Sequence, residues 1–403
     1  MRIIMIAGKG GVGKTSIAGA TGLKAADMGY KTLIMSLDIA HSLSDIFSLS
    51  KGLTDKNKGM PVKIEDKLWI QELDIQEEIQ RNWGDVHKYI TSLFHTAGLD
   101  EILAEELAIL PGMEEVSSLL YINRYTQEDD FDVIILDCAP TGESLRFISI
   151  PTTLEWYISK IFKIQRRVVN YIRPVVKRIY DVPLPEDDYF KSLESLFVRL
   201  EGVDDILTDP NITTVRLVTN PEKIVLKETQ RSFLYFSLYK ICIDGIVMNR
   251  ILPDNIKEAY FDDWRKSQRR YMELAEEYFS PVPIFPVALL QNEPLGSKRL
   301  KKVGNDLYGD NDPTEHFYTE QPYEFTQKDG TFIMTIKLPF IMKEEVELTR
   351  LPEEMIIRVG NFKKHILLPR HVSTYKDVKA KIDGTSLNII FGGDRDGKEK
   401  FKR

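Results

Sequence analysis

Two lysines lie within a run of glycines near the start of this chain, in the segment AGKGGVGKTS from Ala7 to Ser16. The spacing G-x4-GK-[ST] is typical of a loop whose backbone N–H groups curl around a phosphate, with the positive end of a helix behind them. In such a loop Lys14 neutralises phosphate charge, and the Thr15 hydroxyl is a ligand for Mg²⁺. An apolar run precedes the loop and a helical pattern follows it, so we predict a nucleotide site. The residues expected to line it are Gly8, Gly10, Gly11, Val12, Gly13, Lys14, Thr15 and Ser16.

Two aspartates at the ends of apolar runs complete the predicted chemistry. Asp137 ends the run FDVIILD, where a carboxylate holds Mg²⁺ directly or through a water molecule. Asp38 ends the run LIMSLD, where a carboxylate beside the γ-phosphate orients and deprotonates the attacking water. Alone, each aspartate is more often a strand-end cap. With a phosphate loop in the same sheet, we predict that both act on the nucleotide, as magnesium residue and catalytic residue.

The elements that position these residues are short apolar strands separated by helical patterns. Runs of this kind suit strands buried on both faces of a parallel sheet, which predicts a doubly wound α/β core of the phosphate-loop NTPase type. Two insertions, about 75–126 and 154–207, have purely helical patterns and complete a first domain over residues 1–303. The predicted strands are Arg2–Ala7, Thr32–Leu37, Leu68–Leu73, Val133–Leu136, Thr214–Thr219, Gly245–Met248 and Val282–Val287.

A second, smaller domain is predicted after a cluster of Gly, Asp, Asn and Pro residues. Residues 304–322 have the composition of a linker. Residues 323–392 then show short alternating strands with turns between them, the pattern of a small all-β sandwich, and 393–403 form a polar tail. The chain contains one phosphate loop and no internal repeat.

Composition excludes several classes of protein. A net charge of -7 argues against a general nucleic-acid binder. Only two cysteines are present, Cys138 and Cys242, without a CxxC motif, so we expect neither a cysteine zinc site nor a disulfide framework. No apolar run reaches the roughly 18 residues that span a bilayer, and MRIIMIAG leads straight into the glycines. We expect a cytoplasmic protein, with peripheral membrane contact left open.

The motifs GKGGVGKTS, DIAHSLSD and DCAPTGESLR together resemble the deviant phosphate-loop ATPases of the arsenite-pump and tail-anchored-protein-targeting family. The resemblance extends over about residues 1–300, with LVTNPEKIVLKETQR and GIVMNRILP in its later part. It implies ATP and Mg²⁺ as cofactors and a homodimer in which Lys9 reaches the partner's nucleotide. It also implies catalysis by Asp38, a magnesium role for Asp137 and adenine recognition by Asn249. The alternative for Lys9 is that it faces solvent.

Several positions depart from that family's pattern. Ile39 stands where a proline is usual, Cys138 where a threonine is usual, and Glu143 where a histidine is usual. None of these changes removes a phosphate or magnesium contact. Two cysteines cannot build the three-thiolate arsenic site of the arsenite pumps. The zinc-binding CxxC of some targeting factors is absent as well, so we expect packing and nucleotide to hold the dimer.

Two further segments suggest partners without deciding between alternatives. Residues 156–180 are basic and apolar at a helical period, which fits an anionic membrane, an apolar client helix, or simple packing on the ATPase core. Residues 323–391 resemble the α-crystallin domain of small heat-shock proteins in strand rhythm. That domain is expected either to contact unfolded or membrane-protein clients, or to brace the dimer.

Three functions remain open from the sequence. The first is a nucleotide-switched homodimeric ATPase that binds or targets hydrophobic or membrane-protein clients, or docks on a membrane receptor. The second is the motor subunit of an anion or metalloid efflux system. The third is an ATP-gated holdase or scaffold with little turnover.

Overall fold

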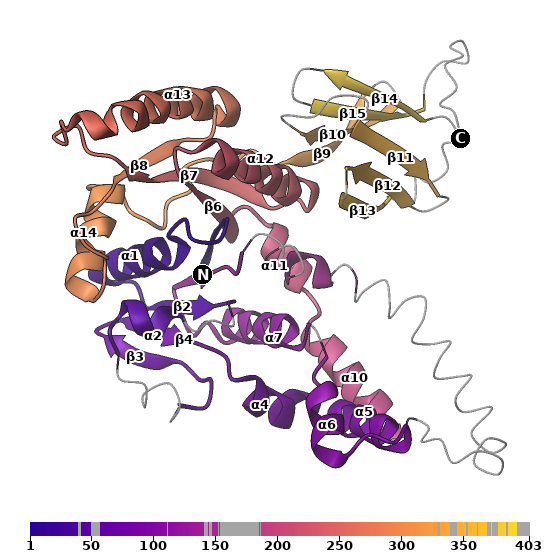
Figure 1. The fold of residues 1–403 in the computed structure, drawn as a ribbon. Coiled ribbons are helices and arrows are strands. Elements are labelled where there is room, and N and C mark those ends of the chain that lie inside the picture. The colour runs from indigo at the N-terminus through magenta and orange to yellow at the C-terminus, as the bar shows by residue number, and fades with distance from the viewer. Residues whose placement is uncertain are drawn as a thin grey trace.

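A computed structural model describes residues 1–38, 42–49, 57–110, 112–140, 147–151, 187–328, 331–338, 345–351, 354–360, 362–368, 378–383 and 386–392, with residues 144, 153, 185 and 372. An eight-stranded sheet in the order β3-β4-β2-β5-β1-β6-β7-β8 forms the core of the larger domain (Figure 1). All of its pairings are parallel except that of β3 with β4. The strands are β1 Arg2–Gly8, β2 Thr32–Ser36, β3 Val62–Glu65, β4 Leu68–Gln71, β5 Val133–Asp137, β6 Thr213–Thr219, β7 Cys242–Ile251 and β8 Ile284–Ala288.

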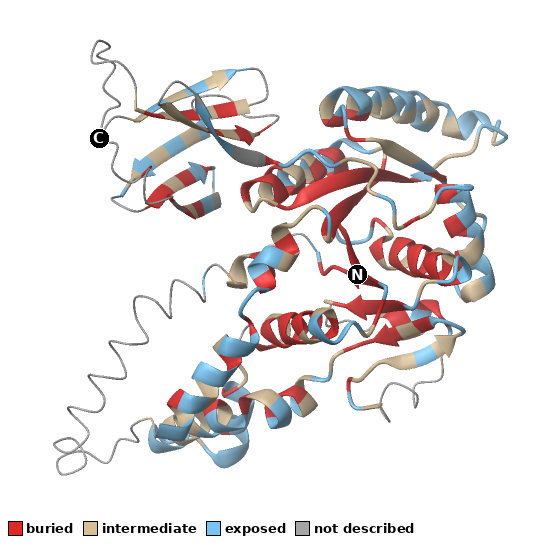
Figure 2. Ribbon diagram, turned by 180° about the vertical axis from the view of Figure 1, so that it is seen from behind, coloured by how far each residue is buried: buried red, intermediate tan, exposed pale blue. Residues whose placement is uncertain are grey.

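The predicted α/β fold with a mostly parallel sheet is confirmed. The inner strands β1, β2, β5 and β6 are buried along their whole length, because helices cover both faces of the sheet (Figure 2). Alternate residues of β1 enter opposite cores: Ile4 and Ile6 join one hydrophobic cluster, while Ile3 and Met5 join the other. The edge strand β3 was not predicted. Its sequence VKIE places charged residues beside apolar ones and is only half-buried, so it lacks the apolar run by which the other strands were found.

Helices pack on each face of the sheet. Helices α1 (Lys14–Asp27) and α14 (Ser297–Tyr308) share the core that contains Ile4. Helices α7 (Met113–Glu128), α11 (Val203–Thr208), α12 (Lys223–Leu238) and α13 (Asp262–Phe279) contribute to the opposite core. The short helix α2 (Ser42–Ile46) follows β2, and a 3-10 turn, η3 (Ala259–Phe261), precedes α13.

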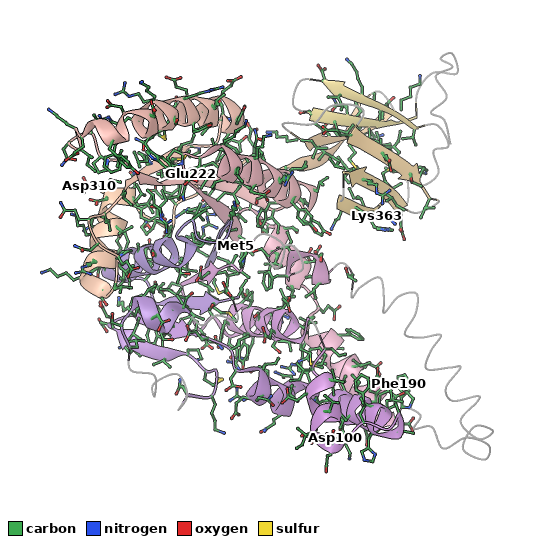
Figure 3. All side chains as sticks on the ribbon, viewed as in Figure 1. Met5, Asp100, Phe190, Glu222, Asp310 and Lys363 are labelled. Carbon is green, nitrogen blue, oxygen red and sulfur yellow. The ribbon has the colours of Figure 1, made fainter. Side chains whose placement is uncertain are left out.

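The first helical insertion extends away from the sheet. Figure 3 shows Met5 inside the sheet, whereas Asp100 lies in this insertion and Phe190 lies in α10 of the second one. Of the second insertion the structure describes α10 and α11, and the basic segment 156–180 lies outside the described residues. In the described part of the chain no helix is both long and apolar enough to cross a membrane. The remaining elements of the region are α4 Ile75–Glu78, the π-helical turn η1 Ile79–Trp83, α5 Gly84–Thr96, α6 Glu101–Leu107 and α10 Asp187–Arg199.

The C-terminal domain is an all-β unit, as predicted. Two antiparallel sheets, in the orders β14-β15-β10-β9 and β11-β12-β13, enclose a core that includes Met334, Ile357 and Phe391. The polar tail 393–403 lies outside the described residues. The strands are β9 Tyr323–Lys328, β10 Thr331–Lys337, β11 Val346–Arg350, β12 Glu354–Val359, β13 Phe362–Leu367, β14 Val378–Asp383 and β15 Ser386–Phe391.

The β domain packs against the end of α12 in its own chain. Leu234 and Leu238 of α12 belong to the hydrophobic core of the β domain. Beside them, the Lys364 ammonium lies 3.9 Å from the ring centroid of Tyr239. Burial of this amine lowers the pKa of Lys364 to about 8, against the opposing effect of the Asp204 carboxylate. The junction therefore contains a buried cation that lies against an aromatic face.

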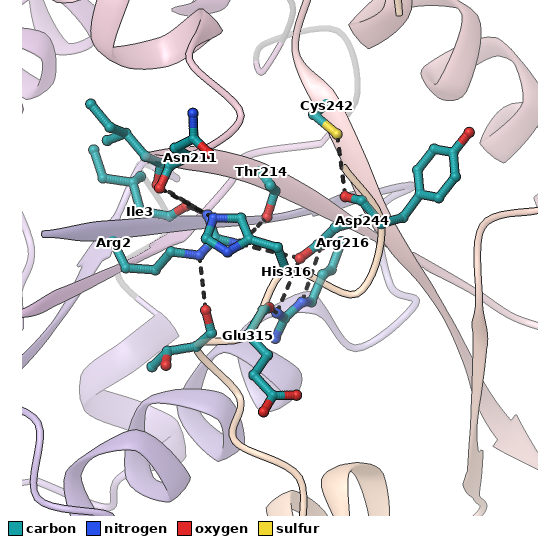
Figure 4. A network of polar contacts seen from close by, with 12 residues as sticks. Arg2, Ile3, Asn211, Thr214, Arg216, Cys242, Asp244, Glu315 and His316 are labelled. Atoms are coloured by element: carbon teal, nitrogen blue, oxygen red, sulfur yellow. Dashed lines mark hydrogen bonds and ion pairs between the residues drawn. The ribbon is translucent and has the colours of Figure 1, made fainter. Parts of the chain in front are cut away.

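The segment between the domains lies across the amino-terminal edge of the sheet. Helix α14 extends to Tyr308, and the following segment 309–322 accepts hydrogen bonds through its backbone. The Arg2 Nε donates to the Thr314 carbonyl at 3.1 Å, and the Arg216 Nη2 donates to the Glu315 carbonyl at 3.1 Å (Figure 4). Both guanidinium groups also contact the Asp244 carboxylate, each at 3.2 Å. This buried network attaches the segment 309–322 to the bottom of the sheet.

Replacing Lys364 by Met should stabilise the protein at neutral pH. The folded pKa of about 8 lies below the usual lysine value near 10.4, so the folded state loses its proton first as pH rises. The desolvation cost is fully present below pH 8 and is relieved between about pH 8 and 10.4. Net of the contacts that the ammonium loses, the Tyr239 ring among them, we expect Lys364→Met to add about 1–2 kcal/mol to the free energy of unfolding at pH 7. Near pH 10 the gain should vanish.

Urea denaturation of both proteins at pH 7 and pH 10 measures this difference. Lys363→Met is the matched control, because Lys363 is the exposed neighbour on the same strand. We expect the control to have little effect at either pH. A Lys364→Met variant that is destabilised at pH 7, or a difference that does not change with pH, would contradict the prediction.

Candidate functional site

The predicted phosphate loop lies at the carboxyl edge of the sheet, between β1 and α1. Gly8 ends β1, and a Cβ at this position would lie 2.3 Å from the Val218 carbonyl oxygen of β6. Gly13 has a φ of 99°, and a Cβ there would lie 2.4 Å from the Asn249 Nδ2. Only glycine fits either position, because neighbouring atoms occupy the space of a side chain. Close packing around the loop therefore explains Gly8 and Gly13.

The two residues after the last glycine face the inside of the loop. Lys14 begins α1 and is buried, and its Nζ donates to the Lys9 carbonyl at 3.4 Å. The Thr15 Oγ1 lies 3.2 Å from the Ser42 Oγ at the start of α2. Lysine and threonine thus lie together at the amino end of a helix, the arrangement that binds phosphate and its magnesium.

Asp137 is the most unusual acid in the site. It ends β5, is 1% exposed, and has no hydrogen-bond partner for either carboxylate oxygen among the described residues. Burial raises the pKa of Asp137 to about 7, against the opposing effects of the Thr15 hydroxyl and the Lys14 ammonium. Two unpaired oxygens beside a threonine hydroxyl are the hard donors that Mg²⁺ prefers, so these residues fit the ion. Thr15 and Asp137 would hold it.

Asp38 lies at the end of the neighbouring strand β2, as predicted. Its backbone is fixed by Ser36, whose Oγ donates to the Asp38 carbonyl at 3.1 Å. The Asp38 carboxylate acts electrostatically on Asp137 and contributes to the raised pKa of that residue. The two predicted acids are therefore brought together at one edge of the sheet. Ile39 and Glu143 lie outside the described residues.

Asn249 contacts the phosphate loop, which the sequence did not predict. It lies near the end of β7, and its Nδ2 donates to the Val12 carbonyl of the phosphate loop at 2.8 Å. Its Oδ1 accepts from the Arg250 N–H at 2.9 Å. The side chain lines a cavity of about 480 Å³ together with Gly13, Ser16 and residues 287–294. Asn249 supports the loop in this structure, and adenine recognition by its amide stays a prediction.

Lys9 differs from Lys14 in its exposure to solvent. Its backbone carbonyl accepts from Lys14, and its side chain is partly exposed. Within the described residues, no hydrogen bond or ion pair engages its ammonium group.

The two cysteines lie at opposite edges of the sheet. Cys138 follows β5 at the carboxyl edge, is fully buried, and has a pKa raised by burial. Cys242 begins β7 at the amino edge, where its thiol contacts the Tyr318 carbonyl. Burial raises the pKa of Cys242 to about 12, so both thiols are protonated at neutral pH. No group of three His, Cys, Asp or Glu side chains suited to a metal occurs in the described ranges.

Two contributors to the site were missed from the sequence. Glu72 lies just beyond β4 and accepts hydrogen bonds from the start of α2. The loop 289–294 lines the cavity next to the phosphate loop. A charged residue within the predicted strand Leu68–Leu73 was a usable signal for Glu72, whereas the loop has no pattern that marks a binding surface.

Comparison with known proteins agrees with this geometry. Residues 1–309 match the family described as "Anion-transporting ATPase", and residues 329–391 match the "HSP20-like domain found in ArsA". The chain is 49% identical to "Putative arsenical pump-driving ATPase 1" of Aquifex aeolicus (strain VF5), over 97% of this chain and 100% of that protein. It is 36% identical to "Putative arsenical pump-driving ATPase" of Prosthecochloris vibrioformis, over 100% and 99%. It is 28% identical to "ATPase get3" of Sclerotinia sclerotiorum, over 76% and 89%.

Replacing Asp137 by Asn should separate stability from metal binding. The amide is isosteric and uncharged, so it removes the cost of a buried carboxylate without partners. We expect Asp137→Asn to raise the free energy of unfolding of the ligand-free protein by about 1–2 kcal/mol. The extra stabilisation by ATP in the presence of Mg²⁺, relative to ATP with EDTA, should be lost.

Thermal unfolding with and without ATP, Mg²⁺ and EDTA measures both effects. Asp132→Asn is the matched control, since Asp132 is exposed beside the opposite end of β5 and should leave the Mg²⁺ effect intact. An Asp137→Asn protein that keeps its Mg²⁺ effect would exclude Asp137 as the metal residue.

Proposed function

Because this chain belongs to the anion-transporting ATPase family, we propose that it is a magnesium-dependent ATP hydrolase that works as a nucleotide-switched homodimer. The reaction is the conversion of ATP and water to ADP and phosphate. The observation that carries the proposal is the buried Asp137 carboxylate, which lacks hydrogen-bond partners among the described residues and faces the Thr15–Lys14 end of a phosphate loop. Such a carboxylate is costly in the empty protein and becomes favourable when a cation binds.

Each residue of the site has a part in this chemistry. The N–H groups of the loop and the Lys14 ammonium bind the β- and γ-phosphates. Thr15 and Asp137 hold Mg²⁺, which neutralises charge on the phosphates. Asp38 orients a water molecule toward the γ-phosphate and accepts its proton. The cavity beside Gly13 and Asn249 is large enough for the nucleoside.

The proposed homodimer follows from Lys9. A second cation near the γ-phosphate stabilises the charge that develops during transfer, and a cation supplied by a partner makes hydrolysis depend on assembly. The Lys9 ammonium has no partner among the described residues, and the chain has only one phosphate loop. The partner is therefore a second copy of this chain, with each Lys9 completing the other site.

The proposed clients are hydrophobic or membrane-protein segments that contact the helical insertion. Apolar side chains gather on α6 and just after it: Ile102 is 76% exposed, Leu107 48% and Leu110 40%. A single exposed leucine needs no explanation, but a cluster on one short helix favours an interaction surface. One relative is named "ATPase get3", which supports the ATPase part of the proposal.

The second candidate function is the motor of an anion or metalloid efflux system. The names of two relatives that match nearly the full chain, both containing "arsenical pump-driving ATPase", favour it. The positions of Cys138 and Cys242 at opposite edges of the sheet count against an arsenic site of three thiolates. Arsenite or antimonite that raises ATPase activity several-fold would favour the efflux motor over the client-binding ATPase.

Replacing Asp38 by Asn should abolish turnover and spare nucleotide binding. An amide cannot accept the proton of the attacking water, and general-base groups contribute about 10²- to 10⁴-fold. We expect phosphate release to fall at least about 100-fold, with ATP affinity changed by less than about threefold. Asp45→Asn, an exposed aspartate in α2, is the charge-matched control and should keep its turnover. Unchanged turnover in Asp38→Asn would remove the assigned base, and negligible turnover in the unmodified protein would favour an ATP-gated scaffold.

Replacing Lys9 by Ala should lower hydrolysis and nucleotide-dependent dimerisation together. Lys14 remains in place, so ATP binding to the single chain should change little. Sedimentation velocity with Mg-ATP, performed in the Asp38→Asn background, measures assembly, and phosphate release measures turnover. Lys88→Ala, an exposed lysine on α5, is the control. If hydrolysis fell while the dimer persisted, Lys9 would be an ordinary catalytic cation of its own site.

A further inference from the structure

The carboxylate of Glu72 is a buried group outside the roles described above. Glu72 follows β4 directly, is 7% exposed, and accepts from the Leu43 N–H at 2.9 Å and the Ser44 N–H at 3.2 Å. The Ser44 Oγ donates to the same carboxylate at 2.5 Å. All three donors belong to the first turn of α2. Among the residues that the structure describes, no basic side chain forms an ion pair with Glu72, so these donors stabilise its charge.

The position of Glu72 places it at the edge of the nucleotide site. Strand β4 pairs with β2, which ends just before Asp38, and β2 pairs with β5, which ends at Asp137. Parallel strands meet at one edge through their carboxyl ends, so Glu72, Asp38 and Asp137 follow three neighbouring strands. The charge of Glu72 also contributes to the raised pKa of Asp137. The carboxylate is thus close enough to act on the site electrostatically.

The helix that Glu72 holds contacts the phosphate loop from its other side. Ser42 begins α2, and its Oγ lies 3.2 Å from the Thr15 Oγ1. The first turn of α2 is therefore fixed twice, by the Glu72 carboxylate and by the hydroxyl that the proposed function assigns to Mg²⁺. Helix α2 has only five residues, too short to be stable without outside contacts. Outside contacts therefore hold it in place: the burial of Leu43 and Ile46 in the core, and these two polar anchors on its first turn.

The neighbours of Glu72 hold other elements. The Gln71 Nε2 donates to the Gly59 carbonyl at 2.9 Å, and the Gln71 Oε1 accepts from the Tyr125 hydroxyl of α7 at 3.0 Å. The Asp74 Oδ1 accepts from the Gln76 N–H at 2.9 Å and caps α4. Among the residues that the structure describes, the hydrogen bonds between the segment 71–74 and α2 are those of Glu72. A change at Asp74 therefore serves as a control, because it disturbs the same segment without removing a contact to α2.

We propose that Glu72 is a positioning residue for hydrolysis, which anchors α2 so that Ser42 keeps its place beside Thr15. The proposal rests on the proposed ATP hydrolysis at this site. Glu72 touches neither phosphate nor metal in this scheme and acts through α2. Removing it should therefore slow the chemical step more than it weakens nucleotide binding.

The test compares Glu72→Ala, Glu72→Gln and Asp74→Ala in the full chain. Small displacements of positioned groups cost up to about 100-fold, so we expect kcat of Glu72→Ala to fall about 10- to 100-fold. ADP affinity and the KM for ATP should change less than about threefold. Glu72→Gln keeps one acceptor for the α2 N–H groups and should recover part of the loss. Asp74→Ala removes a helix cap from the same segment and should leave kcat within about twofold.

Hydrogen exchange of residues 42–49 provides a readout that does not need activity. Loss of the carboxylate should raise exchange in this peptide several-fold in the nucleotide-free protein, while the peptide containing β1 stays protected. Ser44→Ala removes one donor and serves if Glu72→Ala fails to fold; we expect a smaller fall in kcat and a smaller rise in exchange.

The outcomes separate this proposal from the proposed function. If Glu72→Ala keeps its kcat, or if ADP affinity falls by the same factor as kcat, the positioning role is wrong although ATP hydrolysis stands. If exchange of residues 42–49 does not change, the anchor itself is wrong. If the unmodified protein releases no phosphate, the proposed hydrolysis fails and the positioning role with it, while the exchange measurement still decides whether Glu72 anchors α2.

Discussion

The placement of β1 between β5 and β6 is the constraint on which the rest of the structure depends. Its register pairs Ile6 with Asp137 on one side and Gly8 with Val218 on the other. The strand is buried on both faces, so it cannot shift without exposing apolar side chains on one of them. This register places the phosphate loop beside Asp137, the proposed magnesium residue. Asn249, whose side chain contacts the loop, comes from β7, which follows β6 in the same sheet.

Two buried aspartates at opposite edges of this sheet show how the fold separates stability from chemistry. Asp244, at the amino edge, is shared by two guanidinium groups and is fully paired. Asp137, at the carboxyl edge, is as deeply buried and has no hydrogen-bond partner among the described residues. A buried carboxylate with its partners in place is compatible with a stable fold. One without partners lowers the free energy of unfolding until a cation binds to it. The difference in partners, not in burial, is what supports the proposed metal role of Asp137.

Most strands of the sheet and the phosphate loop could be predicted from the sequence, because both depend on local signals. Apolar runs such as Arg2–Ala7 are long enough to mark buried strands, and glycine spacing marks a loop wherever a strand and a helix flank it. Contacts between distant segments are not marked by any such pattern in the sequence. The support that Asn249 gives to Val12, and the anchor from Glu72 to α2, join residues far apart in the chain. Strand β3 was not predicted, because its half-buried edge position requires no apolar run.

The attachment of the segment 309–322 limits how the protein can be shortened. The first matched family region ends at residue 309, which suggests a natural place to cut. A chain ending there would lack the Thr314 and Glu315 carbonyls that accept from Arg2 and Arg216, and would leave two buried cations sharing one carboxylate. The Cys242 thiol would also lose the carbonyls that cover it. An autonomous ATPase fragment must therefore include residues up to 322, so the border between the modules in sequence is not the border in three dimensions.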